Sequence, residues 1–313
     1  MIAFGPVPSR RLGRSLGINN IPLKICTYSC VYCQLGRTLH MQVERQAFYQ
    51  PEEVFAAVRD KVTLAGAAGE SIDYLTVVPD GEPTLDLNLG LEIALLKPLH
   101  IPVAVISNAS LIWRHDVRDD LLGADWVSLQ VGAVDPEIWR RIHRPHGKLE
   151  LAPILEGALQ FARDYRGELV TETMLVAGIN DGQDHLEALA GFLARLQPDR
   201  AYVSIPTRPP AEPWAIPPTE QVVNRAVHIL AREVEHVEYL IGYEGNAFAF
   251  TGDVEQDLLS ITSVHPMRED AVSAFLARAG ADWTAVARMV TQGQLVRAEY
   301  DHHAFYIRRF GKQ

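Results

Sequence analysis

The sequence predicts an α/β protein in which helices cover a parallel β-sheet, and two observations support this fold class. Short apolar runs rich in β-branched residues alternate with stretches of helical periodicity through most of the chain. These apolar runs are continuous rather than alternating with polar residues, which is typical of strands buried on both faces. A partial barrel and a doubly wound sheet both fit this pattern, and both place functional side chains at the carboxyl ends of the strands.

The strand–helix units number about six, which is fewer than the eight of a complete barrel. The expected strands lie near 17–26 and at 74–78, 103–106, 126–129, 169–176 and 201–205. The first expected helix begins at Pro51, where Glu52 and Glu53 follow at the positive end of the helix dipole. The further helical windows are 87–99, 136–142, 151–163 and 184–195.

The pattern changes in the last third of the chain. A proline-rich segment, 206–218, is expected to cross the barrel face as a loop or to act as a hinge. Three helices and a hairpin then form a winged-helix pattern, in which Asp282 is the N-cap of the third helix. Their expected ranges are 254–264, 269–277 and 282–292 for the helices and 295–300 and 304–307 for the hairpin. We therefore predict a core domain at 1–250, including the basic N-terminal segment and the proline-rich loop, and a winged-helix-like domain at 251–313.

The charge of the chain argues against binding nucleic acid over a broad surface. Lys and Arg together number 29 and Asp and Glu 39, which gives a formal net charge of −10. Binding to phosphates requires clustered cations instead. From residue 252 onward, seven basic and eight acidic residues leave −1, so the winged-helix pattern is also a poor DNA-binding candidate. The first 40 residues differ, because they carry five Lys and Arg and no acidic residue.

The cysteine content and the apolar runs predict where the protein resides. No apolar run is long enough for a transmembrane helix, and the first residues lack the pattern of a signal peptide. The chain has three cysteines, which cannot all pair in disulfides. We therefore expect a soluble cytoplasmic protein that is not associated with a membrane.

The three cysteines are the strongest chemical signal in the sequence. Cys26, Cys30 and Cys33 lie within eight residues, so their thiolates can converge on one metal centre. A four-iron cluster usually takes four cysteines, so three would leave one iron open to another ligand. A zinc site built from the three cysteines and His40 is an alternative with less usual spacing, and three unrelated free thiols are another.

The spacing Cys-x3-Cys-x2-Cys, with Tyr32 before the last cysteine, resembles the signature of radical S-adenosylmethionine (radical SAM) enzymes. The resemblance extends over roughly residues 1–250 and implies a partial (β/α)6 TIM-like barrel. It also implies that Cys26, Cys30 and Cys33 hold three irons of a [4Fe–4S] cluster, that SAM binds the open iron, and that Tyr32 lies against the adenine.

Further segments are similar to the SAM-binding segments of that family. Gly81 and Glu82, in Asp-Gly-Glu-Pro-Thr-Leu, resemble its Gly-Gly-Glu segment, with an aspartate in place of the first glycine. By this resemblance Glu82 accepts a hydrogen bond from the methionine ammonium, and Asn108 and Ser128 contact SAM at the ends of two strands. Val176, or the neighbouring Leu175, would pack against the adenine.

Within the family, the chain resembles the wyosine-synthase-like branch, in the segments 81–85, 142–145 and 176–181. The archaeal tRNA enzyme of that branch carries a second cluster on additional upstream cysteines. This chain has no cysteine before Cys26, and its acidic charge disfavours tRNA, so we expect family membership without the tRNA reaction.

The expected activity is reductive cleavage of SAM to a 5′-deoxyadenosyl radical that takes hydrogen from an unidentified substrate. A tRNA-modifying wyosine-type synthase is one alternative, and a nucleic-acid- or peptide-binding regulator that uses the winged helix is another. The expected partners are a small-molecule, peptide or protein substrate and a reductase such as flavodoxin or ferredoxin. DNA and tRNA are disfavoured. The candidate substrate contacts are Arg10, Arg11, Arg14, Arg144 and Arg208.

Overall fold

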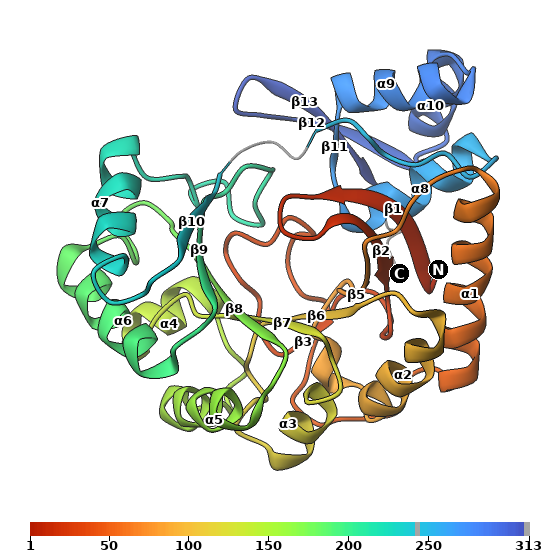
Figure 1. Cartoon of the computed structure of the whole chain (residues 1–313). Helices are drawn as coiled ribbons and strands as arrows, with labels where there is room; N and C mark the ends of the chain where they lie inside the picture. Colours follow the sequence, from red (N-terminus) through yellow and green to blue (C-terminus); the bar gives the residue numbers. More distant parts are fainter. Residues whose placement is uncertain (242–244, 310–313) are drawn as a thin grey trace.

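The computed structural model describes residues 1–241 and 245–309, and its main feature is a curved eight-stranded sheet with helices on the outer face (Figure 1). The strands follow one another across the sheet in the order β1-β2-β5-β6-β7-β8-β9-β10. β1 is antiparallel to β2, and every other neighbouring pair is parallel. The bounds are β1 (Ala3–Ser9), β2 (Gly13–Ile18), β5 (Tyr74–Val77), β6 (Val103–Ser107), β7 (Trp126–Gln130), β8 (Glu168–Met174), β9 (Arg200–Ser204) and β10 (Val237–Leu240).

This strand order decides between the two architectures that the sequence left open. A doubly wound sheet reverses its strand order at one point. Here the parallel strands follow the order of the chain without a reversal, as in a barrel, and the sheet is not closed between β1 and β10. The expected α/β partial barrel is therefore confirmed.

The helices that cover the barrel alternate with its strands. Their bounds are α1 (Pro51–Ala67), α2 (Leu89–Leu96), α3 (His115–Leu121), α4 (Pro136–His143), α5 (Leu151–Asp164), α6 (Gln183–Leu196) and α7 (Glu220–Leu230), with short 3₁₀ helices at Pro83–Leu85 and Lys97–Leu99. α1 begins at Pro51 as expected, and it buries Val54 and Val58, four residues apart, against the sheet. Within the described residues, no helix has the length and apolar character needed to cross a membrane.

The structure corrects the expected elements at the barrel edges. The strand expected near 17–26 is two separate strands, β2 and the short β3 (Ile25–Cys26), which pairs with β4 (His40–Met41). β1, β10, α3 and α7 were not expected. β1 contains Pro6 and Pro8, which lower strand propensity and are tolerated because β1 is an edge strand. The other five expected strands and the expected helices are present, with ends shifted by a few residues.

The C-terminal module, residues 254–309, has three helices and a three-stranded antiparallel sheet of order β11-β13-β12, as a winged helix has. Its elements are α8 (Val254–Val264), β11 (Met267–Arg268), α9 (Glu269–Ala279), α10 (Trp283–Thr291), β12 (Leu295–Tyr300) and β13 (His303–Arg308). The Asp282 side chain caps α10 by accepting a hydrogen bond from the Thr284 nitrogen, as expected. The strand β11 was not expected, and residues 310–313 of the expected domain lie outside the described part of the chain.

The core of the C-terminal module also includes side chains of the barrel. Phe4 and Val7 of β1 belong to the same apolar cluster as Phe248, Leu258 and Phe275, and the module lies against β1 in Figure 1. The division of the chain at residue 250 therefore stays a prediction, because β1 contributes to the cores on both sides of it.

Candidate active site at the carboxyl ends of the strands

A cavity of about 380 Å³ opens at the carboxyl ends of the barrel strands. Strand residues reach it because alternate side chains point into the barrel: Trp126 and Tyr202 belong to an apolar cluster that fills the lower barrel, and Gln130, Glu172 and Met174 line the cavity above it. A parallel barrel places ligand-binding side chains at this end of the sheet.

The three cysteines lie on the loop that begins at β3, and Cys33 lines the cavity. The loop turns tightly, since the Cys33 nitrogen donates to the Cys30 carbonyl at 3.2 Å. It is fixed against the end of α4, because the Val31 nitrogen donates to the Ile142 carbonyl at 3.0 Å. The loop is therefore held by its own tight turn and by the end of a covering helix.

The environment of the three thiols suits a metal cluster. None of them is in a disulfide, and burial raises the pKa of each, to about 12 for Cys26. The charges of Cys26 and Cys33 further raise the pKa of Cys30, so the three thiolates form together only if a cation compensates them. Bound iron supplies that charge, and the donor set therefore fits the cluster.

The zinc alternative does not fit this geometry. Among the described residues, no three His, Cys, Asp or Glu side chains are placed to hold a single metal ion. His40 is exposed on β4. A [4Fe–4S] cluster does not require the three sulfurs to converge as closely as a zinc ion does. In the cluster each thiolate binds its own iron, whereas all zinc ligands bind the same atom.

Asn108, just after β6, contacts the first cysteine. Its side-chain amide donates to the Cys26 sulfur at 3.4 Å and to the Thr27 hydroxyl at 2.9 Å. Asn108 also lines the cavity. The end of β6 is thus joined directly to the cysteine loop.

Glu82 is a buried carboxylate that joins the turn after β5 to the end of β6. Its Oε1 accepts from the hydroxyls of Thr84 and Ser107 at 2.6 and 2.7 Å, and its Oε2 accepts from the Asn108 nitrogen at 2.7 Å. Burial raises the pKa of Glu82, and the hydrogen bonds from Thr84 and Asn108 oppose that shift. Glu82 thus lies beneath the cavity wall, engaged by the protein itself.

Gly81 lines the cavity and lets two chain segments approach each other. A Cβ atom at this position would lie 1.9 Å from the Ile25 carbonyl oxygen, in the strand that carries Cys26. The Glu82 nitrogen donates to that same carbonyl at 3.2 Å. Glycine is needed here for the approach of the cysteine strand to the turn.

His143, at the end of α4, lies beside the second cysteine. Its Nδ1 is 3.3 Å from both the Cys30 sulfur and the Tyr32 hydroxyl. Burial lowers the pKa of His143 to about 3, so the ring is neutral. The contact of His143 with Cys30 had no signal in the sequence.

The comparisons with known proteins agree with this site. The family model of the radical SAM superfamily matches residues 20–193, which include the three cysteines and the strands β5 to β8. The chain belongs to the radical SAM superfamily. It is a radical SAM enzyme, and the superfamily implies a [4Fe–4S] cluster and SAM.

Relatives of this radical SAM protein have a similar length and fold. It is 47% identical over 309 residues to the UPF0026 protein MJ1312 of Methanocaldococcus jannaschii, covering 98% of this chain and 96% of that protein. A solved structure of TYW1 with a bound lysine-pyruvate adduct has a TM-score of 0.55 at 16% identity and covers 71% of this chain and 74% of that one. A radical SAM methyltransferase from Sphaerobacter thermophilus has a TM-score of 0.53 at 16% identity, with 72% and 66% covered. At these identities the two structures show a shared fold.

Three of the expected SAM contacts of the radical SAM protein, Glu82, Ser128 and Val176, are not among the residues that line the cavity. Glu82 is fully buried. Ser128 lies on β7 between Trp126 and Gln130, so it points into the barrel, but it is buried. Val176 is buried after β8, and its nitrogen donates to the Asn180 side chain at 2.9 Å. By contrast Tyr32, Gly81 and Asn108 line the cavity.

The expected substrate arginines separate into two groups. Arg10, Arg11 and Arg208 line the cavity, whereas Arg14 and Arg144 do not. Arg14 pairs with Glu70 and donates to the Ser71 carbonyl, because strand alternation turns it away from the inward-facing Ser15. Arg144 pairs with Glu212 at 2.6 Å. Arg14 and Arg144 therefore do not line this cavity, and their contact with substrate stays a prediction.

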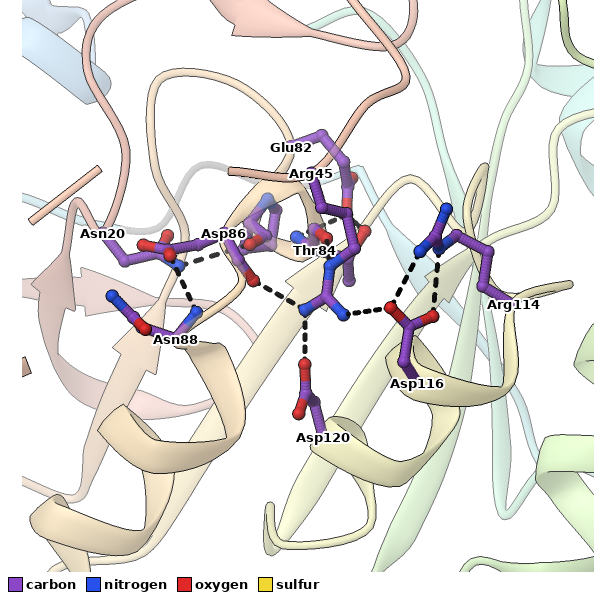
Figure 2. Close-up of polar contacts among 10 residues, drawn as sticks. Asn20, Arg45, Glu82, Thr84, Asp86, Asn88, Arg114, Asp116 and Asp120 are labelled. Carbon is purple, nitrogen blue, oxygen red and sulfur yellow. Dashed lines mark hydrogen bonds and ion pairs between the residues drawn. The ribbon is translucent and has the colours of Figure 1, made fainter. Parts of the chain in front are cut away.

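Arg45 is a supporting residue that sequence reasoning missed. Its side chain is 3% exposed and donates to the carbonyls of Thr84 and Asp86 at 2.8 and 2.6 Å (Figure 2). The same guanidinium pairs with Asp116 and Asp120 of α3. Arg45 therefore connects α3, in the outer helix layer, to the turn in which Glu82 lies.

Proposed function

We propose that Cys26, Cys30 and Cys33 hold three irons of the cluster and that SAM binds the fourth. The observation that carries this is the set of three partly buried thiols in one loop at the barrel mouth, in a chain with no fourth cysteine. When bound and reduced, the cluster supplies the electron that cleaves SAM to methionine and a 5′-deoxyadenosyl radical, which takes a hydrogen atom from the substrate.

The chain's own residues bind and orient SAM in this proposal. Tyr32, Gly81 and Asn108 contact it, because they line the cavity on the side of the cysteine loop. Glu82 acts as a positioning residue: it accepts four hydrogen bonds from Thr84, Ser107 and Asn108, and so orients Asn108 and the turn that carries Gly81. Because its side chain is fully buried, Glu82 reaches the methionine ammonium only if its neighbours move. Ser128 and Val176 contact SAM only if the surrounding side chains move.

The turn between β1 and β2 excludes water from the opposite side of the cavity. Arg11 pairs with Glu172 and lies 5.8 Å from the Trp126 ring, so the turn is fixed across the barrel. The Glu172 carboxylate also accepts from the Ser204 hydroxyl at 2.8 Å. Such a dry site protects a reactive radical from side reactions.

Within the superfamily we place the chain in the wyosine-synthase-like branch, on the segments 81–85, 142–145 and 176–181. We do not assign it a tRNA-modifying reaction, because its three cysteines serve one cluster. A flavodoxin- or ferredoxin-type reductase is the proposed electron donor, and the reducing cytoplasm is the proposed compartment.

Anaerobic reconstitution with iron and sulfide tests this proposal. We expect about four irons per chain, and an electron paramagnetic resonance signal of the dithionite-reduced protein that changes when SAM is added. Bound 5′-deoxyadenosine should then accumulate. A protein that binds only zinc, or a reduced cluster whose signal is insensitive to SAM, contradicts the proposal.

A further inference from the structure

Arg208 joins three separate segments at the cavity. Its Nη1 donates to the side-chain oxygen of Gln34, the residue after Cys33, and its Nη2 donates to Nε2 of His265 at 2.8 Å. Arg208, Gln34 and His265 all line the cavity. Arg208 lies in the proline-rich loop, Gln34 lies in the cysteine loop, and His265 directly follows α8. Part of the cavity wall therefore comes from the C-terminal module.

The hydrogen bond from Arg208 defines the protonation state and the tautomer of His265. Because a guanidinium only donates, Nε2 of His265 must accept, and the ring is therefore neutral with its proton on Nδ1. The ring also packs edge-on against Phe248, with the centroids 5.1 Å apart. His265 is thus held in one orientation at the cavity wall.

Polar contacts on other sides fasten the C-terminal module to the barrel. Lys61 of α1 contacts Asp257 of α8 at 3.3 Å, and Arg278 of α9 pairs with Glu70 at 3.0 Å. The Tyr300 hydroxyl, at the end of β12, donates to the Pro206 carbonyl at 3.2 Å. With the shared apolar cluster of β1, these contacts fix the module on more than one side.

The opening between the two edges of the barrel sheet is also bridged. Arg10, in the turn after β1, donates to the carbonyl of Leu240 at the end of β10, and both residues line the cavity. Residues of both sheet edges therefore meet at the cavity, and His265 of the module adds to the same wall.

The size of the cavity limits what can share it with SAM. Cavities that hold one drug-sized ligand measure about 300–1,000 Å³. At about 380 Å³ this cavity lies near the low end, and SAM occupies a large part of it. The space left beside SAM fits a small molecule, and a folded macromolecule cannot enter it while the contacts described above hold the module in place.

We infer that the C-terminal module is a fixed wall of the reaction chamber, with His265 facing the substrate, and that the substrate is a small molecule. This inference rests on the proposed function, since it takes the cavity as the site of radical chemistry. It assigns the winged-helix pattern a structural and specificity role instead of nucleic-acid binding.

The experiment uses the full-length reconstituted protein and an extract of cells grown in deuterium oxide. The extract is divided into a low-molecular-mass fraction and a macromolecular fraction, and each is incubated with protein, SAM and dithionite. Mass spectrometry then measures deuterium in the 5′-deoxyadenosine. His265→Ala is compared with His228→Ala, a control at an exposed histidine on α7.

We expect deuterium from the low-molecular-mass fraction, and a tenfold or greater loss of its transfer in His265→Ala that His228→Ala does not show. We also expect SAM binding to reduce hydrogen exchange in the segment that follows α8. Deuterium that arrives only from the macromolecular fraction, or from neither fraction, overturns the inference. A protein that forms no 5′-deoxyadenosine even without extract contradicts the proposed function instead, so the two failures are distinguishable.

Discussion

The Oε2 atom of Glu82 accepts a 2.7 Å hydrogen bond from the backbone nitrogen of Asn108. Through this contact the turn after β5 and the end of β6 become one unit, and the Asn108 side chain reaches from that unit to the Cys26 sulfur. Through Asn108, the Glu82 carboxylate thereby helps to set the position of the cysteine loop.

Replacement of Glu82 should therefore affect both stability and SAM binding. Glu82→Ala leaves the buried donors of Thr84, Ser107 and Asn108 without an acceptor, and we expect a loss of about 3 kcal/mol in the free energy of unfolding. Urea titration measures this loss, and calorimetry should show weaker SAM binding in the reconstituted protein. Unchanged stability and unchanged SAM affinity in this variant would remove Glu82 from its positioning role.

A methyl group at Gly81 should push apart the turn that contains Glu82 and the strand that carries Cys26. Gly81→Ala places a Cβ atom on the Ile25 carbonyl, and because both partners are backbone we expect a loss of about 1–3 kcal/mol in stability and lower iron content. Gly191→Ala is the control: this glycine lies within α6 with open space around it, so the change should stabilise the protein by up to about 1 kcal/mol. Equal stability of the two variants would show that the close approach at Gly81 is not constraining.

The barrel interior strands were predictable from the sequence, and the barrel edges were not. β6 and β7 are continuous apolar runs because both of their faces are buried. β10 has four residues, of which Glu238 and Tyr239 are exposed, so its pattern does not differ from that of a loop. β1 could not be predicted either, because its prolines lower the strand propensity of the segment.

The site was predictable as far as its residues are close in sequence. The cysteine spacing identified the loop, and the resemblance to the radical SAM family pointed to Gly81 and Asn108, which follow two predicted strands. Arg45 and its partner Asp116 are 71 positions apart, and no local pattern connects them. The different positions of Arg11 and Arg14 also depend on the register of β2, which the sequence did not define.

Arg45 should contribute more to the free energy of unfolding than an exposed arginine does. Arg45→Met removes one of the two ion-pair partners of Asp116, the ion pair with Asp120, and the donor to the carbonyls of Thr84 and Asp86, so we expect a loss of about 3–5 kcal/mol in the free energy of unfolding. Arg59→Met, at an exposed ion pair with Asp60, should change stability by less than about 1 kcal/mol. Urea titrations of both variants at the same salt concentration test the difference, and similar values for the two would contradict it.

Loss of one cysteine should abolish the chemistry and leave most of the fold. In Cys30→Ala we expect no 5′-deoxyadenosine above background and a reduced iron content, while circular dichroism stays that of the wild type, since the loop keeps its bonds to α4. Turnover at the wild-type rate would reject the assignment of Cys30 as an iron ligand.

Glu92 of α2 should make the protein less stable at alkaline pH. Burial, together with the nearby charge of Asp86, raises the pKa of Glu92 to about 8, and a hydrogen bond from Asn20 opposes this shift only in part. The unfolded chain has a glutamate pKa of about 4.3. Because the folded value is the higher one, the stability from protonated Glu92 is complete below the unfolded pKa and is lost as pH rises through the folded pKa.

Glu92→Gln should remove this dependence, since the amide does not titrate. We expect the free energy of unfolding of the wild type to fall between about pH 5 and pH 8, and that of the variant to fall less over the same range. Burial also raises the pKa of Asp86 to about 6 and that of Asp80 to about 7, so part of the slope should remain in the variant and decrease further when Asp86→Asn is added. Urea titrations across this range measure the slopes, and identical slopes for wild type and Glu92→Gln would mean that Glu92 is ionised in the folded protein throughout.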